Sequence, residues 1–279
     1  MIKALAIVVV ILLVAGVLVR WARLLDKHFV FLPEREMVGA PGDVGLTFED
    51  VFFSTSDGVT LHGWFVPAES NTTLLWFHGN AGNISHRIDG ILDLHEWLGV
   101  NVFIFDYRGY GLSQGKPSEK GTYLDAEAAL GYLRGHHATG RGSKIVLFGQ
   151  SMGSAVAVET AIRHRVHAVI LEAPFTSLIG MARSDYPYLP VRLLIQLVES
   201  RYDSLSKISR VRSPMLISHG DQDAFVPIEM GRKLFDAASE PKRFYTVEGA
   251  GHNDMFYVGK GAYFETLRLF IGDPTAGSS

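Results

Sequence analysis

The residues best suited to chemistry form the pentapeptide Gly149-Gln150-Ser151-Met152-Gly153. In this G-x-S-x-G pattern a strand turns sharply into a helix and presents one serine hydroxyl at the turn. The flanking glycines leave room for so tight a bend. Residues 145–148 form a short apolar run, as a buried parallel strand should, and apolar side chains recur at helical spacing after the turn. We therefore predict that Ser151 is a nucleophile.

A serine needs a base within hydrogen-bond reach and an acid that holds the base. When the nucleophile follows a parallel strand in this way, the chain order is nucleophile, acid, histidine. The histidines beyond Ser151 are His164, His167, His219 and His252. Only His252 also follows an acid at the end of the next-to-last strand, and it lies in a glycine-rich loop. His252 is the predicted base.

The acid is expected in the loop after residues 215–218, because parallel sheets gather their chemistry at the carboxyl ends of strands. Asp221 and Asp223 compete there. We favour Asp223, because Asp221 directly follows Gly220 inside the turn and is placed to cap it. Glu172, at the end of the preceding strand, is the third candidate.

Acyl transfer also needs N–H donors for the oxyanion of its transition state. The backbone N–H of Met152, directly after the nucleophile, is the first predicted donor. The second is the backbone N–H of Asn80, in the glycine-containing loop 78–83. His78 is interpreted as a structural loop histidine.

The elements that must position these loops follow an α/β pattern. Residues 46–53 and 60–66 predict an antiparallel hairpin around Ser56-Asp57-Gly58. From residue 73 onward short apolar runs alternate with amphipathic stretches, which predicts a mostly parallel central sheet with flanking helices. The predicted parallel strands are 73–77, 102–105, 145–148, 166–171, 215–218 and 243–247, and the later helices are 228–238 and 260–271.

The domain organisation is read from composition. We expect an N-terminal membrane anchor at 1–23, a linker at 24–45, a catalytic domain at 46–272 and a flexible tail at 273–279. Residues 174–207 are too long for a plain connection and predict a short helical lid. Its apolar side chains either cover the core or form a pocket for an acyl chain.

The predicted anchor rests on the unbroken apolar run from Ala4 to Val19. A spanning helix needs about 20 apolar residues. A cleaved signal peptide is the alternative, but Arg20-Trp21-Ala22-Arg23 stands where small residues should precede a cleavage site. Basic residues after the run outnumber those before it, which by the positive-inside rule favours a cytoplasmic catalytic domain. The amino-terminal tail before the run is very short, so the side of the membrane stays open.

Composition excludes several other classes. The net charge is −3 and no basic stripe stands out, so no nucleic-acid partner is expected. Cysteine is absent, which removes disulfides and thiolate catalysis. Without an H-E-x-x-H pattern or a similar cluster, we expect no metal and no organic cofactor. The oligomeric state stays open.

These motifs together resemble the alpha/beta-hydrolase superfamily. The resemblance rests on the G-x-S-x-G pentapeptide, HGNAGN at 78–83, FDYRGYGLSQG at 105–115, HGDQDAFVP and GAGHND. HGNAGN, the apolar N-terminus and DSLSKI at 203–208 look especially like the membrane-anchored bud-emergence-type branch. This resemblance implies an α/β-hydrolase fold, a triad of Ser151, Asp223 and His252, and an oxyanion hole at Asn80 and Met152. Some animal members of this branch remove palmitoyl groups from proteins. Some of these enzymes carry cysteine clusters, which this sequence lacks.

We expect a membrane-anchored serine hydrolase that cleaves carboxylic esters or thioesters. Its substrate is expected to be a small molecule, an acylated molecule or a lipid. Peptidase or amidase activity on the same triad is the enzymatic alternative. A non-catalytic membrane-tethered binding module is the alternative from another class, because a fold alone does not determine function.

Overall fold

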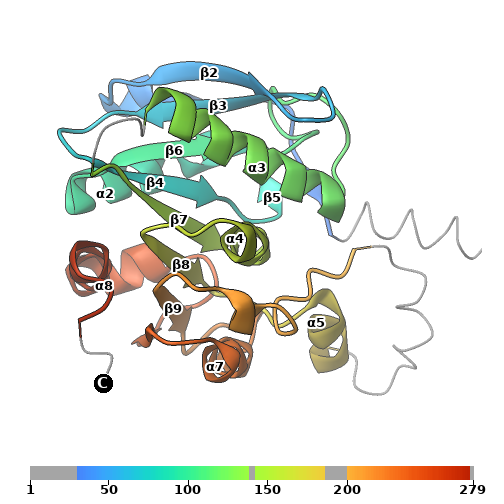
Figure 1. Ribbon diagram of the computed structural model, residues 1–279, viewed down its shortest axis with the longest axis vertical. Coiled ribbons are helices and arrows are strands. Elements are labelled where there is room, and N and C mark those ends of the chain that lie inside the picture. Colours follow the sequence, from blue (N-terminus) through green and yellow to red (C-terminus); the bar gives the residue numbers. More distant parts are fainter. Residues whose placement is uncertain (1–29, 138–141, 186–199, 277–279) are drawn as a thin grey trace, which may run out of the picture.

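An eight-stranded sheet forms the centre of the computed structural model, which describes residues 30–137, 142–185 and 200–276 (Figure 1). The strand order is β10-β9-β8-β7-β4-β6-β3-β2. The strands are β2 (Glu49–Ser54), β3 (Thr60–Val66), β4 (Thr72–Phe77), β6 (Asn101–Phe105), β7 (Lys144–Gln150), β8 (Ala168–Glu172), β9 (Met215–Gly220) and β10 (Lys242–Val247). A separate short pair, β1 (Leu32–Pro33) and β5 (Ala81–Gly82), runs parallel.

The predicted hairpin and parallel sheet are confirmed. Strand β2 pairs antiparallel with β3, β3 pairs antiparallel with β6, and the other neighbours are parallel. The hairpin begins at Glu49, three residues later than predicted, because the Leu46 N–H is bonded to the Pro41 carbonyl in the preceding turn. All residues of β4, β6, β8 and β9 are buried, which explains their continuous apolar runs.

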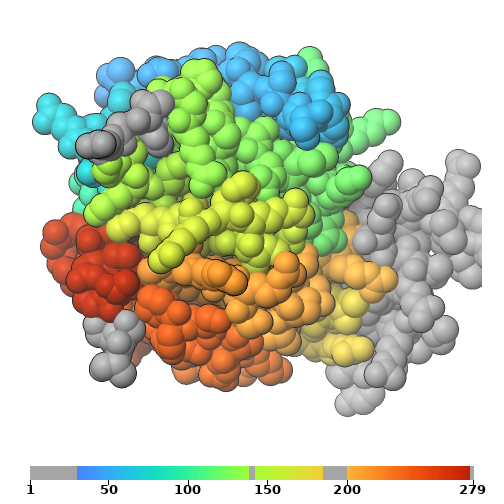
Figure 2. Space-filling view, in the orientation of Figure 1, coloured from blue at the N-terminus to red at the C-terminus, as the bar shows by residue number. Residues whose placement is uncertain are grey.

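Helices cover both faces of the sheet. They are α2 (Ile88–Leu98), α3 (Glu119–His136), α4 (Met152–Arg163), α5 (Leu178–Asp185), α7 (Ile228–Ala237) and α8 (Met255–Gly272), with short 3-10 turns η1 (Pro41–Val44), η2 (Ile84–Arg87) and η3 (Ile208–Arg210). Helices α2 and α8 pack together in one apolar core, and α3, α4 and α7 pack in the core of the opposite face. Figure 2 shows α3 and α4 lying side by side over that face.

The described part of the predicted linker packs against the domain. Phe31 is buried against the ring of Tyr202, and β1 pairs with β5. Residues 30–45 are therefore not a free spacer, because their backbone supplies hydrogen bonds that the loop containing β5 needs.

The structure describes the predicted lid only in part and does not describe the predicted anchor. Helix α5 occupies the start of the lid, while residues 186–199 lie outside the described residues. The predicted anchor at 1–23 also lies outside them. Within residues 30–137, 142–185 and 200–276, no helix has the length and apolar character that crossing a membrane requires.

Candidate active site

Ser151 lies at the turn between β7 and α4 in a backbone conformation that serine rarely adopts, with φ 52° and ψ −116°. Such a conformation is strained and persists only when its surroundings enforce it. The Ser151 N–H donates to the Glu172 carbonyl at 2.8 Å, and Ser154 Oγ donates to the Gly149 carbonyl at 2.6 Å. These bonds hold the turn and place the largely buried Ser151 side chain at the strand end.

The two glycines of the motif are required by close backbone contacts. A Cβ atom on Gly153 would lie 1.9 Å from the Phe77 carbonyl oxygen, and one on Gly149 would lie 2.5 Å from the Gly153 carbonyl oxygen. No side chain fits at either distance. The spacing G-x-S-x-G therefore follows from packing α4 directly against β7 and β4.

His252 reaches Ser151 from the loop between β10 and α8. Its Nε2 lies 3.0 Å from Ser151 Oγ, and its Nδ1 lies 2.7 Å from Asp223 Oδ2. The imidazole also packs on the ring of Phe225, with ring centroids 4.9 Å apart. The structure thus brings the three predicted triad residues into one continuous hydrogen-bonded chain.

Asp223 is held as an ionised acceptor. Its Oδ1 accepts hydrogen bonds from the N–H groups of Phe225 and Val226, at 2.9 and 2.8 Å. Burial alone would raise the pKa of Asp223, but hydrogen bonds from His219, His252 and the Val226 N–H outweigh burial and hold this pKa well below its ordinary value. The carboxylate is therefore charged at neutral pH.

His219 also contributes to the site, although the sequence did not predict a role for it. It is fully buried at the end of β9, and its Nε2 donates to the Val226 carbonyl at 2.8 Å and lies 3.4 Å from Asp223 Oδ2. It therefore braces the loop that carries the acid. The available signal was its position at a strand end, four residues before Asp223.

The competing carboxylates have other partners. Asp221 Oδ1 accepts a hydrogen bond from the Gly249 N–H at 2.7 Å, which ties the acid loop to the histidine loop. Glu172 accepts from the hydroxyl of Tyr263 at 2.6 Å and from the side-chain amide of Gln150 at 2.9 Å. The carboxylate that is hydrogen-bonded to His252 is therefore that of Asp223.

The loop that carries Asn80 runs beside the nucleophile, since a Cβ atom on Gly79 would lie 3.8 Å from Ser151 Cβ. His78 Nδ1 donates to the Gly79 carbonyl at 2.7 Å. Burial, with a smaller contribution from Arg87, lowers the pKa of His78 to about 3, so the ring is neutral. Because a trans peptide points its C=O and N–H in opposite directions, this bond also orients the Asn80 N–H.

Two backbone donors next to Ser151 remain available to a ligand. Within the described residues, neither the Asn80 N–H nor the Met152 N–H donates to a protein acceptor. Met152 begins α4, whose first N–H groups have no partner inside the helix. An oxyanion formed at Ser151 would find both predicted donors unoccupied.

Comparisons with known proteins agree with this geometry. Residues 68–186 match the sequence profile described as serine aminopeptidase, S33. The protein bem46 of Schizosaccharomyces pombe is 36% identical over 249 residues, covering 86% of this chain and 81% of that protein. The human alpha/beta hydrolase domain-containing protein 17B is 36% identical over 219 residues, covering 78% and 73%. The chain belongs to the alpha/beta-hydrolase family. The resemblance to the bud-emergence-type branch is thereby confirmed, and the chain is a serine hydrolase.

A solved structure supports the fold of this hydrolase. The esterase Pf2001 of Pyrococcus furiosus superposes with a TM-score of 0.72 at 21% identity, and the match covers 86% of this chain and 98% of the esterase. At that identity the likeness establishes the architecture of the sheet and its flanking helices.

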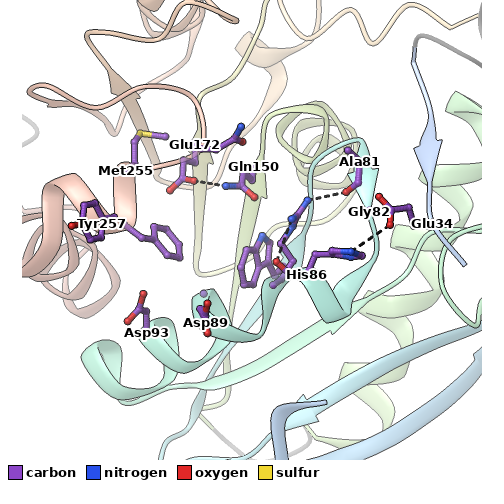
Figure 3. Close-up of a pocket in the computed structure, with 15 residues that line it drawn as sticks. Glu34, Ala81, Gly82, His86, Asp89, Asp93, Gln150, Glu172, Met255 and Tyr257 are labelled. Carbon is purple, nitrogen blue, oxygen red and sulfur yellow. Dashed lines mark hydrogen bonds and ion pairs between the residues drawn. The ribbon is translucent and has the colours of Figure 1, made fainter. Parts of the chain in front are cut away.

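A pocket of about 600 Å³ lies between α2 and the start of α8, and it is lined by sequence neighbours of Asn80, Ser151 and His252 rather than by these residues themselves (Figure 3). Neighbours of the three functional loops line it: Ala81 and Gly82 beside Asn80, Gln150 beside Ser151, and Asn253 beside His252. Its walls include the aromatic residues Trp76, Phe256 and Tyr257 and the carboxylates Glu34, Asp89, Asp93 and Glu172. Figure 3 shows Asp89 and Asp93 on α2, across the pocket from Gln150 and Glu172. The lining of this pocket is aromatic and acidic.

Glu172 makes stability depend on pH. It is 1% exposed, and burial raises its pKa from 4.5 to about 7. The Glu172 carboxyl therefore stays protonated up to a higher pH in the folded hydrolase than in the unfolded chain. Its contribution to the free energy of unfolding should fall as pH rises from about 4.5 to 7, by up to about 3 kcal/mol.

Glu172→Gln isolates this effect, because glutamine keeps the shape of the side chain without titrating. Urea unfolding of both proteins between pH 5 and 8 measures it. We expect the variant to gain stability relative to the wild type as pH rises. A difference that stays constant across this range would contradict the assignment.

Proposed function

We propose that this hydrolase cleaves carboxylic esters or thioesters through an acyl-enzyme, with Ser151 as nucleophile, His252 as general base and Asp223 as its acid partner. One observation carries the proposal: a continuous hydrogen-bonded chain from Ser151 Oγ through His252 to Asp223 Oδ2, with distances of 3.0 and 2.7 Å. That arrangement is what activates a serine for acyl transfer.

The reaction follows from these contacts. His252 Nε2 takes the Ser151 proton as Oγ bonds to the carbonyl carbon, and the carbonyl oxygen becomes an oxyanion facing the Asn80 and Met152 N–H groups. His252 then gives the proton to the departing alcohol or thiol, and the acyl group stays on Ser151. In the second half His252 deprotonates water, which attacks the acyl carbon. The bond from that carbon to Ser151 Oγ then breaks, His252 returns the proton to Oγ, and the acid is released.

Asp223 acts through His252. Because it is ionised and accepts from Nδ1, it holds the imidazole in the tautomer that leaves Nε2 free to accept the serine proton. Its negative charge also stabilises the imidazolium formed during each half-reaction.

An N-terminal membrane anchor is part of this proposal. It is supported by the apolar run at 4–19. Strand β1, which follows the proposed anchor in the chain, joins the domain at β5, directly after the proposed oxyanion donor Asn80. The ten residues 20–29 would reach at most about 35 Å. An anchored enzyme would thus work close to the membrane surface, which favours acylated or lipid substrates. Retention of the full chain in carbonate-washed membranes, lost on deletion of residues 1–23, tests the anchor.

The substrate class is tested with matched acyl donors. A series of p-nitrophenyl esters from two to sixteen carbons, and S-acyl thioesters with the same acyl groups, should be hydrolysed by the wild type but not by Ser151→Ala. Acyl-length preference reports the length of the space that receives the acyl chain. Failure of both series to turn over would refute the ester and thioester assignment.

Cleavage of peptides at the amino terminus is the second candidate. It is favoured by the matched profile, described as serine aminopeptidase, and by the pocket carboxylates Asp89 and Asp93, which suit a substrate ammonium group. Alanine p-nitroanilide and its N-acetyl derivative separate the candidates. Hydrolysis of the free amine alone, faster than that of any ester, would select the peptidase.

A further inference from the structure

Asn83 is the last residue of HGNAGN. Its side chain is fully buried and makes hydrogen bonds to two separate segments of the chain. Its Nδ2 donates to the carbonyl oxygens of Glu34 and Glu36, at 3.1 and 2.6 Å. Its Oδ1 accepts from the Ser85 N–H and the Ser85 hydroxyl, at 2.9 and 2.6 Å. One amide therefore joins the N-terminal strand segment to the start of η2.

The segment that Asn83 holds, residues 32–36, is also hydrogen-bonded to the loop that contains Asn80. The Leu32 N–H donates to the Asn80 carbonyl at 3.0 Å, and the Glu34 N–H donates to the Gly82 carbonyl at 3.1 Å. The hydroxyl of Tyr110 gives the Asn80 carbonyl a second bond at 2.8 Å. The backbone that follows the Asn80 N–H, at Asn80 and Gly82, is thus held by residues 32–34, while His78 holds the Gly79 carbonyl that precedes it.

We propose that Asn83 is a positioning residue for the oxyanion hole: its buried amide clamps residues 32–36 onto loop 79–82 and so fixes the Asn80 N–H beside Ser151. This inference rests on the proposed acyl-transfer function. It also assigns a catalytic purpose to the segment that leads into the domain from the proposed anchor.

The clamp is needed because β1 and β5 are each only two residues long. A strand pair of that size supplies too few hydrogen bonds to order a loop by itself. A donor in an oxyanion hole stabilises the transition state only if it is held in place before the reaction, and a shift of about 1 Å can lower a rate about 100-fold.

Asn83→Asp tests the clamp. Aspartate keeps the size and the acceptor atoms of the side chain, but it replaces the N–H donors with an oxygen that faces two carbonyl oxygens. We expect kcat for a p-nitrophenyl ester to fall about 10- to 100-fold while KM changes less than about threefold. The affinity for an arylboronic acid, which forms a tetrahedral adduct on Ser151, should fall in parallel with kcat.

Asn101→Asp is the matched control. Asn101 is also a buried asparagine whose Nδ2 donates to main-chain carbonyls, those of Ser70 and Thr72, at 3.0 Å each. It begins β6, at the end of the sheet opposite the triad. Thermal unfolding should show a comparable loss of stability, with kcat within about threefold of the wild type. Equal losses of kcat in the two variants would overturn the proposal.

Amide hydrogen exchange gives a readout that does not require turnover. Peptides covering 32–38 and 79–85 should exchange faster in Asn83→Asp than in the wild type or in Asn101→Asp, and unchanged exchange there would refute the clamp. An inactive wild type with this exchange pattern would refute the proposed function instead. If Asn83→Asp does not fold, Leu32→Pro removes the N–H bonded to Asn80 and should lower kcat in the same way; unchanged kcat would overturn the clamp.

Discussion

Ser151→Ala should lower kcat for ester hydrolysis by about 10⁵-fold or more, the scale at which loss of a triad serine removes covalent catalysis. No other described hydroxyl is bonded to His252, so no neighbouring group inherits the role. Substrate binding should change little, because Oγ is a small part of the pocket surface. Initial rates with p-nitrophenyl esters at enzyme concentrations high enough to detect residual turnover measure the effect.

Ser213→Ala is the control for this substitution. Ser213 is a buried serine whose Oγ accepts a hydrogen bond from the Val166 N–H at 3.0 Å, at the opposite end of the sheet from the triad. It should cost stability but leave kcat within about twofold. A Ser151→Ala enzyme that keeps more than a tenth of wild-type kcat would show that another group is the nucleophile.

Asp223→Asn should lower kcat about 10⁴-fold, the magnitude expected when the acid partner of a triad loses its charge. Asparagine can still accept from the Phe225 and Val226 N–H groups through Oδ1, so the loop should survive. Its NH₂ group would then face His252 Nδ1 as a donor. That arrangement favours the tautomer with a protonated Nε2, which cannot accept the Ser151 proton.

The comparison variant is Asp221→Asn. Its Oδ1 accepts one hydrogen bond, from the Gly249 N–H, and an asparagine oxygen accepts that bond equally well. Turnover should therefore stay within about threefold of the wild type. If Asp221→Asn were the more damaging change, Asp221 rather than Asp223 would be the acid partner.

The sequence predicted those parts of the site that depend on local backbone chemistry. The glycines around Ser151 report contacts that exclude a Cβ atom, and the order of the loops follows from a parallel sheet that gathers strand ends at one edge. Asp223 was preferred over Asp221 from its place in the turn, and in the structure it is Asp223 that contacts His252. Such signals lie within a few residues of the side chain concerned.

The parts that could not be predicted depend on contacts between distant segments. Residues 30–45 have the proline and glycine content of a linker, and nothing within them reveals that β1 pairs with β5 about fifty residues later. Nothing in the sequence around Asn83 distinguishes it from other loop asparagines, because its partners Glu34 and Glu36 lie almost fifty residues earlier in the chain. His219 was excluded as a base by chain order, which says nothing about bracing a loop.

Element boundaries differed for a similar reason. Helix α8 begins at Met255 instead of Lys260 and is interrupted at Lys260, where φ is 38°. The apolar periodicity after Lys260 was recognisable, whereas the preceding turn is held by packing of Met255 and Phe256 against the core beneath α2. Tertiary packing, rather than local propensity, decides where this helix starts.

Labelling by an active-site fluorophosphonate tests whether Ser151 is an activated nucleophile. The full-length protein is incubated with the probe, digested and analysed by peptide mass spectrometry. The expected result is stoichiometric modification on the peptide containing Ser151, strongly slowed in Asp223→Asn and absent in Ser151→Ala. A folded wild-type protein that is not labelled, or is labelled at a different serine, would contradict it.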